Sequence, residues 1–268
     1  MPKPETYTHG HHQSVIRSHA VRTARDSAAY LLPHLRPGMS VLDVGCGPGT
    51  ITLDLARAVA PGRVVGLENV PEPLVTARAN ATDREDSTTR FVLGDIYQLP
   101  CATRSFDVVH AHQVLQHLGD PVAALREMAR VCRPAGLVAV RDADYGAMAW
   151  YPPSDGLTMW RDVYRRLARA NGAEPDAGRR LRSWARAAGL HDVAVSTSTW
   201  VYANPAATSW WGQTWSARAR ESSFAAQACE RGLLDEAGIA AIAAAWESWG
   251  ADPDAWFVSV HTEILATP

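Results

Sequence analysis

One short stretch, Val41 to Thr50, constrains the fold more than any other feature of the chain. Its sequence is Val-Leu-Asp-Val-Gly-Cys-Gly-Pro-Gly-Thr, a brief apolar run with one acidic residue, followed by glycines at alternate positions. Because glycine lacks Cβ, Gly45, Gly47 and Gly49 permit positive φ angles and let backbone amides approach a ligand closely. We therefore expect a strand, a tight loop shaped for a nucleoside, and then a helix.

The spacing of the acidic residues restricts which nucleoside-containing ligand fits the loop. A second apolar strand, Arg63 to Leu67, is followed by Glu68, at the distance where a strand–helix–strand unit places a carboxylate against a ribose. The dinucleotide fingerprint is G-x-G-x-x-G, whereas the glycines here follow G-x-G-x-G, with Asp43 two residues before the first. A diphosphate gains nothing from a nearby carboxylate, but a cationic amino-acid tail tolerates one, directly or through water. The pattern favours S-adenosylmethionine over NAD.

With these motifs the chain resembles the class I S-adenosylmethionine-dependent methyltransferases. The resemblance continues in Phe91 to Asp95, in Leu99-Pro100, in Ser105 to Val109, and in Leu125 to Gly136, where Cys132 and Ala135 replace the usual Leu and Gly. It covers roughly residues 38 to 143, with several motifs in the right order at strand–helix spacing. Within the family, the chain is similar to the ubiquinone and menaquinone C-methyltransferases and to many methyltransferases of secondary metabolism.

The resemblance implies a set of cofactor-binding residues. Asp95 is implied to accept a hydrogen bond from the adenine amine, and Cys46 is interpreted as a small residue tolerated among glycines. The full set expected around the cofactor is Asp43, Gly45, Cys46, Gly47, Glu68, Asn69, Asp95, Ile96, Ala111 and His112.

The order of elements predicts an α/β fold. Strands are expected at 39–44, 63–68, 90–94, 106–111 and 136–143, alternating with helices near 50–60, 71–82 and 121–132. This alternation predicts a parallel sheet with right-handed crossovers, whose ligands bind outside the strand carboxyl ends. By resemblance, two late strands at 193–202 and 256–265 complete a Rossmann-like, seven-stranded, mostly parallel sheet.

The rest of the chain is predicted to be mainly helical. Apolar spacing indicates an N-terminal helix from Ser14 to Leu32, and helices near 155–171, 178–188, 206–230 and 233–249. We expect an N-terminal lid and helix at 1–37, a cofactor-binding core at 38–204 with 254–268, and a helical cap inserted before the last strand at 205–253. His9 to His12 lead into the first helix, and we interpret them as part of a lid that closes over the cofactor.

Seven of the ten tryptophans lie in the cap and its flanks. Trp246 and Trp249 share a stripe with Ile239 and Ile242, which predicts helix packing. Trp210, Trp211 and Trp215 are harder to bury together, because neighbouring residues of a helix point to different sides. We expect at least one of them to face a pocket or a partner, and we hypothesise that the inserted helices wall an aromatic or otherwise apolar acceptor site.

Methyl transfer from a sulfonium requires an aligned acceptor, excluded water and, for a hydroxyl or an acidic carbon, removal of a proton. His112, His117 and Tyr145 are the catalytic candidates, and Asp142 is a further group at the rim. Each histidine has a structural alternative as a packing or capping residue. His110-x-His112 could suggest a metal site, but no carboxylate partner lies nearby in sequence, and we expect none.

Composition excludes several other functions. Lys3 is the only lysine, and it lies outside every predicted strand and helix, so we expect neither a Schiff-base lysine nor a P-loop lysine. The formal net charge of −2 and the absence of a dense basic tract argue against nucleic acid as partner. The four scattered cysteines are expected to be reduced thiols, and no apolar run has transmembrane length, so we expect a cytoplasmic protein without membrane contact. The sequence leaves open whether it forms a homodimer.

The leading hypothesis is a methyltransferase that modifies O or C of a small apolar or aromatic metabolite. Tyr151-Pro152-Pro153 has the reverse order, in the wrong place, of the Pro-Pro motif of adenine and glutamine N-methyltransferases, so we interpret it as a turn. One alternative is an enzyme that binds S-adenosylmethionine but uses the sulfonium only as a fixed charge to guide a cyclisation. An NAD-linked oxidoreductase is the other alternative.

Overall fold

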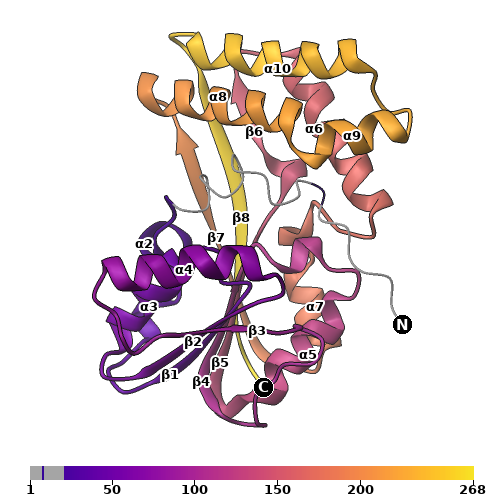
Figure 1. Ribbon diagram of the computed structural model, residues 1–268. Coiled ribbons are helices and arrows are strands. Elements are labelled where there is room, and N and C mark those ends of the chain that lie inside the picture. Colours follow the sequence, from indigo (N-terminus) through magenta and orange to yellow (C-terminus); the bar gives the residue numbers. More distant parts are fainter. Residues whose placement is uncertain (1–7, 9–20) are drawn as a thin grey trace.

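The structure, a computed structural model, describes residue 8 and residues 21–268. Its centre is a sheet in the order β3-β2-β1-β4-β5-β8-β6, with β7 also paired to β8 (Figure 1). The first five strands pair in parallel, and β6 and β7 pair antiparallel with β8, which is itself antiparallel to β5. Their bounds are β1 Ser40–Val44, β2 Arg63–Glu68, β3 Arg90–Leu93, β4 Phe106–His112, β5 Cys132–Ala143, β6 Ala149–Tyr151, β7 His191–Tyr202 and β8 Trp256–Thr267. The predicted mostly parallel Rossmann-like arrangement is confirmed.

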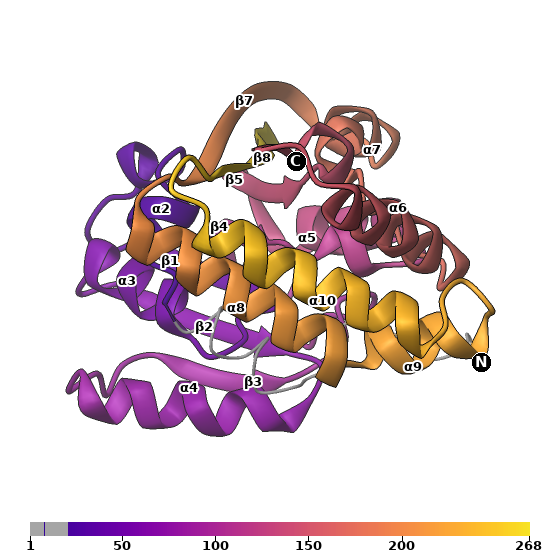
Figure 2. The same cartoon turned by 90° about the horizontal axis from the view of Figure 1, so that it is seen from above.

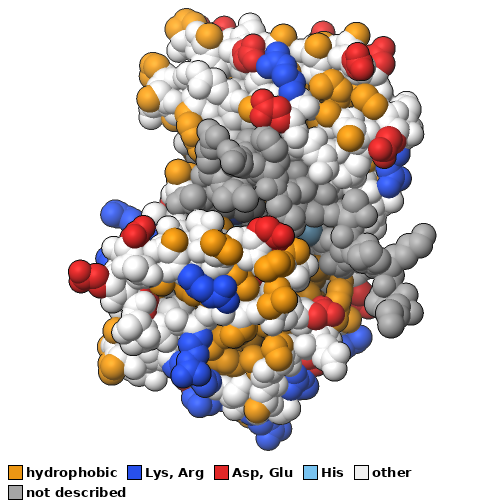
Figure 3. Space-filling view, in the orientation of Figure 1, with side chains coloured by type: hydrophobic (Ala, Val, Ile, Leu, Met, Phe, Trp, Pro, Cys, Tyr) orange, Lys and Arg blue, Asp and Glu red, His pale blue; other side chains and the backbone are white. Residues whose placement is uncertain are grey.

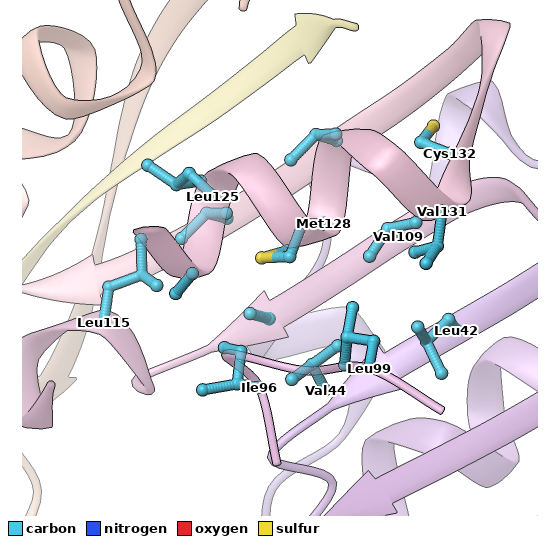
Figure 4. Packing of buried hydrophobic residues seen from close by; sticks show 14 of the residues in the cluster. Leu42, Val44, Ile96, Leu99, Val109, Leu115, Leu125, Met128, Val131 and Cys132 are labelled. Atoms are coloured by element: carbon cyan, nitrogen blue, oxygen red, sulfur yellow. The ribbon is translucent and has the colours of Figure 1, made fainter. Parts of the chain in front are cut away.

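Helices cover both faces of the sheet because successive strand residues point in opposite directions. On one face Leu42 and Val109 pack under α5 (Pro121–Val131) and α7 (Leu181–Ala187), and Figure 4 shows Met128 of α5 over this apolar surface. On the other face Val41 and Val108 pack under α3 (Thr50–Val59) and the segment before β1. α4 (Pro71–Asp83) lies beside β3 and completes the second layer.

A second apolar cluster forms above the strand ends. It joins α6 (Asp155–Ala170), α8 (Pro205–Glu221), α9 (Ser223–Glu230) and α10 (Glu236–Ala251) around buried aromatic rings. Figure 2 shows α8 and α10 lying side by side over the rest of the molecule. They approach closely where Gly212 faces Gly250, since a Cβ on Gly250 would lie 2.9 Å from the Thr208 carbonyl oxygen. The predicted burial of Trp246 and Trp249 is confirmed.

The N-terminal helix differs from the expectation. Residues 14–20 lie outside the described part, and in the remainder the helix α2 covers only Ala24–Ser27, followed by a 3₁₀ turn at Leu32–His34. Thr23 accepts a hydrogen bond from the Asp26 amide, and the Asp26 side chain accepts one from the Thr23 amide. This reciprocal cap fixes a helix start in the middle of the predicted helix. The His9–His12 segment also lies outside the described residues.

Three further details depart from the sequence expectation. Within the described part of the chain the sheet has eight strands instead of the seven expected, because β6 pairs with β8 directly before Pro152-Pro153. The predicted helix over 206–230 divides at Ser222, whose extended backbone ends α8 and whose hydroxyl caps α9. The helix expected near 178–188 begins as a 3₁₀ turn, Ala177–Arg180. No described helix is both long enough and apolar enough to cross a bilayer.

Candidate active site

A cavity of about 290 Å³ lies where the carboxyl ends of β1, β2 and β4 face α8. Loops that follow these parallel strands emerge at one edge of the sheet, which is where α/β folds bind their ligands. Residues of the glycine loop line one end of the cavity, and Trp211, Trp215 and Arg218 of α8 line the other. The cavity therefore joins the parallel sheet to the upper helical cluster.

Most of the predicted site residues line this cavity. They are Asp43, Gly45, Cys46, Gly47, Glu68, Asn69, Asp95, Ile96, His112, His117 and Tyr145. Ala111 is the exception: it is fully buried and belongs to the cluster under α5. Because strand residues alternate between faces, His112 points toward the cavity side and Ala111 points away. The Ala111 side chain thus belongs to the core, and its expected contact with the cofactor stays a prediction.

The glycine loop exposes bare backbone to the cavity. Gly45, Gly47 and Gly49 have φ angles of 69°, 52° and 76°, a region that residues with side chains rarely adopt. A Cβ on Gly45 would overlap Val114, whereas a Cβ on Gly47 would meet no atom within 4 Å. Since Gly47 lines the cavity, a side chain at this position would occupy ligand space.

Two carboxylates lie beside this loop. Glu68 accepts hydrogen bonds from the Gly47 amide at 3.0 Å and the Asn69 amide at 2.8 Å, which hold its side chain at the cavity. Asp95 accepts one from the Tyr97 amide at 2.9 Å, in the turn after β3. The buried Ile96 adds an apolar surface next to Asp95. Two carboxylate acceptors, a glycine backbone without side chains and an apolar surface form a set suited to a nucleoside with a charged tail.

Asp43, near the end of β1, links this strand to β4 and α3. Its carboxylate lies 2.7 Å from His110 Nδ1 and accepts a hydrogen bond from the Thr52 hydroxyl at 2.6 Å. This contact holds the buried His110 side chain against Asp43 inside the sheet. Within residue 8 and residues 21–268, no group of three His, Cys, Asp or Glu side chains is placed to hold a metal ion.

The two histidines predicted to be catalytic are both uncharged near neutral pH. Burial, assisted by the nearby Arg141, lowers the pKa of His112 well below its usual value. Burial also lowers the pKa of His117 to about 3. Gln116 Nε2 lies 3.0 Å from His117 Nε2 and fixes this ring beside the cavity.

Aromatic rings form the opposite wall. Tyr145 stacks on Tyr164 with ring centroids 4.3 Å apart, and burial raises the pKa of Tyr145. Trp211 stacks on Tyr202 at 4.1 Å, whereas Trp210 is 37% exposed and does not line the cavity. The prediction that at least one tryptophan of this trio faces a pocket is confirmed.

Comparison with known proteins decides the family. A model of the family described as "Methyltransferase domain" matches residues 35–189. An uncharacterised methyltransferase of Schizosaccharomyces pombe is 32% identical over 97% of this chain and 95% of its own length. The chain belongs to the methyltransferase family. The predicted family and the assignment as an enzyme are confirmed.

Solved structures of other proteins show the same fold. A phosphoethanolamine N-methyltransferase of Haemonchus contortus, bound to phosphomonomethylethanolamine and S-adenosylhomocysteine, has a TM-score of 0.55 at 15% identity and covers 87% of this chain and 50% of its own. The [4+2]-cyclase SpnF has a TM-score of 0.55 at 21% identity, covering 99% and 89%. At these identities, the likeness establishes the fold of the methyltransferase and no more.

Sequence reasoning missed several cavity residues of the methyltransferase. Arg22, Gln116, Met148 and Arg218 line the cavity, but none was singled out from the sequence. Arg218 had a usable signal, because it follows Trp211 and Trp215 at the seven- and three-residue spacing of one helix face. On the surface shown in Figure 3, acidic and basic side chains occur on both the upper and lower parts, in keeping with a net charge near zero.

Proposed function

We propose that this enzyme transfers a methyl group from S-adenosylmethionine to an oxygen or carbon atom of a small, apolar or aromatic metabolite. The observation that carries the proposal is the continuous cavity, which joins the glycine loop to a wall of aromatic rings. S-adenosylmethionine is the cofactor, and when bound it supplies an electrophilic methyl group on a sulfonium sulfur. The chain's own residues then have to bind, orient and shield the reactants.

The residues around the loop fit this cofactor. We assign the ribose hydroxyls to Glu68 and the adenine amine to Asp95, because each carboxylate lies at a strand end on the cavity. Ile96 supplies the apolar contact for the base, and the backbone of Gly45 to Gly47 receives the aminocarboxypropyl end. The bare surface at Gly47 supports this assignment, since a side chain there would fill the space.

The acceptor is assigned to the far end of the cavity. Residues 205–253 form a cap whose rings, with Trp200 and Met148 of the core, exclude water from the transfer. In this division, 38–204 with 254–268 forms the cofactor-binding core, and most of the lid and helix expected at 1–37 lies outside the described residues. His112, His117 and Tyr145 also line the cavity, and we assign acceptor contacts to them.

Calorimetry with S-adenosylhomocysteine tests the cofactor assignment. Glu68→Ala removes the carboxylate assigned to the ribose, so the dissociation constant should rise about tenfold or more, a loss of about 1.4 kcal/mol or more. Glu72→Ala is the matched control, because Glu72 is an exposed residue in the first turn of α4 and does not line the cavity. No measurable heat with the unmodified protein would refute the proposed function.

A second function has one observation in its favour. The [4+2]-cyclase SpnF shares the fold over almost the whole length of this chain, although the identity is low. In that case the bound sulfonium would act only as a fixed charge. Mass spectrometry of the product separates the two functions: a methyl mass increase with one S-adenosylhomocysteine per turnover supports transfer, and an isomerised product of unchanged mass supports cyclisation.

A further inference from the structure

Gln113 has no part in the cofactor assignment, although it lines the cavity. It follows β4 directly, and its backbone has a φ angle of 55°, a left-handed conformation that is unfavourable for a residue with a side chain. The Gln113 amide donates a hydrogen bond to the Arg141 carbonyl oxygen at 2.7 Å, which holds this turn against β5. A long polar side chain is therefore carried by a backbone that is fixed at the cavity.

A residue of the last strand anchors the Gln113 side chain. Gln113 Nε2 lies 2.7 Å from Nε2 of His261, whose side chain has no exposed surface. His261 lies in β8 between Ala143 of β5 and Ser198 of β7, so strands hold its backbone on both sides. The Trp200 ring lies against the His261 ring, with centroids 4.5 Å apart. These contacts leave the imidazole in one position, and the Gln113 carboxamide is tied to it.

The protonation of His261 determines which end of the Gln113 carboxamide remains available. Burial, with Arg141 nearby, lowers the pKa of His261 well below its usual value, so the ring is neutral and carries a single proton. The amide NH₂ group is only a donor, so Nε2 of His261 has to accept, and the proton lies on Nδ1. The Ser259 backbone carbonyl favours a proton on this ring. The Gln113 oxygen, Oε1, is then left without a hydrogen-bond partner in the described part of the chain, on a half-buried residue of the cavity.

We infer that the methyl acceptor carries a hydroxyl group that donates a hydrogen bond to Gln113 Oε1, and that His261 is the positioning residue that fixes this oxygen. The inference rests on the proposed function and adds a chemical requirement to it. The aromatic wall selects for an apolar body, but it does not distinguish a hydroxyl from a methyl ether. A carboxamide oxygen that has to accept does so, because a ligand without a donor leaves it unpaired on binding.

The test compares 2-naphthol with 2-methoxynaphthalene, in which a methyl group replaces the hydroxyl proton. Each probe is titrated with the full chain saturated with S-adenosylhomocysteine, and its fluorescence, excited outside the tryptophan band, gives the dissociation constant. We expect 2-naphthol to bind about tenfold more tightly. Gln113→Met keeps the length of the side chain without the carboxamide and should remove this preference. Gln113→Glu keeps an oxygen that accepts and should retain it.

The matched control for these variants is Gln213→Met. Gln213 is exposed on α8, donates to the Ser209 hydroxyl and does not line the cavity, so its loss should leave the preference unchanged. The role of His261 is tested in the unmodified protein by nitrogen-15 NMR of labelled histidine, where we expect a protonated Nδ1 and an unprotonated Nε2. His261→Phe, where it folds, should reduce the preference for 2-naphthol several-fold without weakening S-adenosylhomocysteine binding.

Four results would overturn the inference: equal binding of the two naphthalenes, a preference that survives in Gln113→Met, a protonated Nε2 on His261, or no binding of 2-naphthol. S-adenosylhomocysteine binding is measured first, by calorimetry. Failure at that stage refutes the proposed function, whereas failure only with the naphthalenes refutes only the recognition of a hydroxyl group by Gln113.

Discussion

At the scale of single residues, Asp142 illustrates how a buried carboxyl group makes the stability of the fold depend on pH. It lies in β5 with no exposed surface, accepts a hydrogen bond from the Gln116 amide, and burial raises its pKa from 3.8 to about 8. The folded protein keeps this proton up to about pH 8, but the unfolded chain releases it near pH 4. The free energy of unfolding therefore falls as the pH rises from about 4 to about 8, and the whole loss is reached above about pH 8.

Asp142→Asn should consequently stabilise the protein at high pH. The amide keeps the oxygen that accepts from Gln116 but has no charge to bury, so at pH 8 we expect a gain on the order of a few kcal/mol in the free energy of unfolding. The gain should shrink toward zero near pH 4. Denaturant unfolding at several pH values measures both. Asp162→Asn, at an exposed position on α6, should give no such trend, and an equal gain at every pH would contradict the explanation.

At the scale of elements, the loop between β1 and α3 provides a second prediction. Gly47→Ala places a side chain in a left-handed conformation that costs roughly 1–2 kcal/mol, and it also fills ligand space. Gly38→Ala has the same backbone problem, with φ of 90° and no neighbour within 4 Å, but Gly38 does not line the cavity. Both variants should lose similar stability, while only Gly47→Ala should weaken S-adenosylhomocysteine binding, by about tenfold or more. Calorimetry that shows equal affinities in both would count against the loop assignment.

Elements could be predicted from the sequence where local chemistry determines them. The strand ends at Glu68 and the loop glycines follow from alternation and from the φ angles that the turn requires. The failures also have local causes. Thr23-x-x-Asp26 is a capping pattern that should have started a new helix, and a three-residue strand before Pro152 is too short to show a period of two.

At the scale of the whole molecule, the acceptor end of the cavity was the hardest part to foresee. Gln116, Met148 and Arg218 come from a 3₁₀ turn, a connecting segment and α8, far apart in sequence, and only tertiary packing brings them together. No spacing rule relates such positions. The end at the glycine loop, in contrast, is built from consecutive strand–loop units, and most of the residues that the sequence predicted there do line the cavity.

The same long-range packing predicts how the molecule unfolds. β8 crosses both apolar clusters, since Phe257 packs among the rings of the upper helices while Ile264 lies in the cluster under α5. Because one strand belongs to both, loss of either cluster exposes the other, and we expect a single cooperative transition. Tryptophan fluorescence reports mainly on the upper cluster, which buries Trp160, Trp211, Trp215, Trp246 and Trp249, and far-ultraviolet circular dichroism reports on the whole. In urea the two unfolding curves should coincide. Phe257→Leu should lower the free energy of unfolding by about 1 kcal/mol or more, so the midpoints of both curves should move together to a lower urea concentration. A fluorescence transition that precedes the circular dichroism change would show that the helical cap unfolds by itself, and that β8 does not couple it to the sheet.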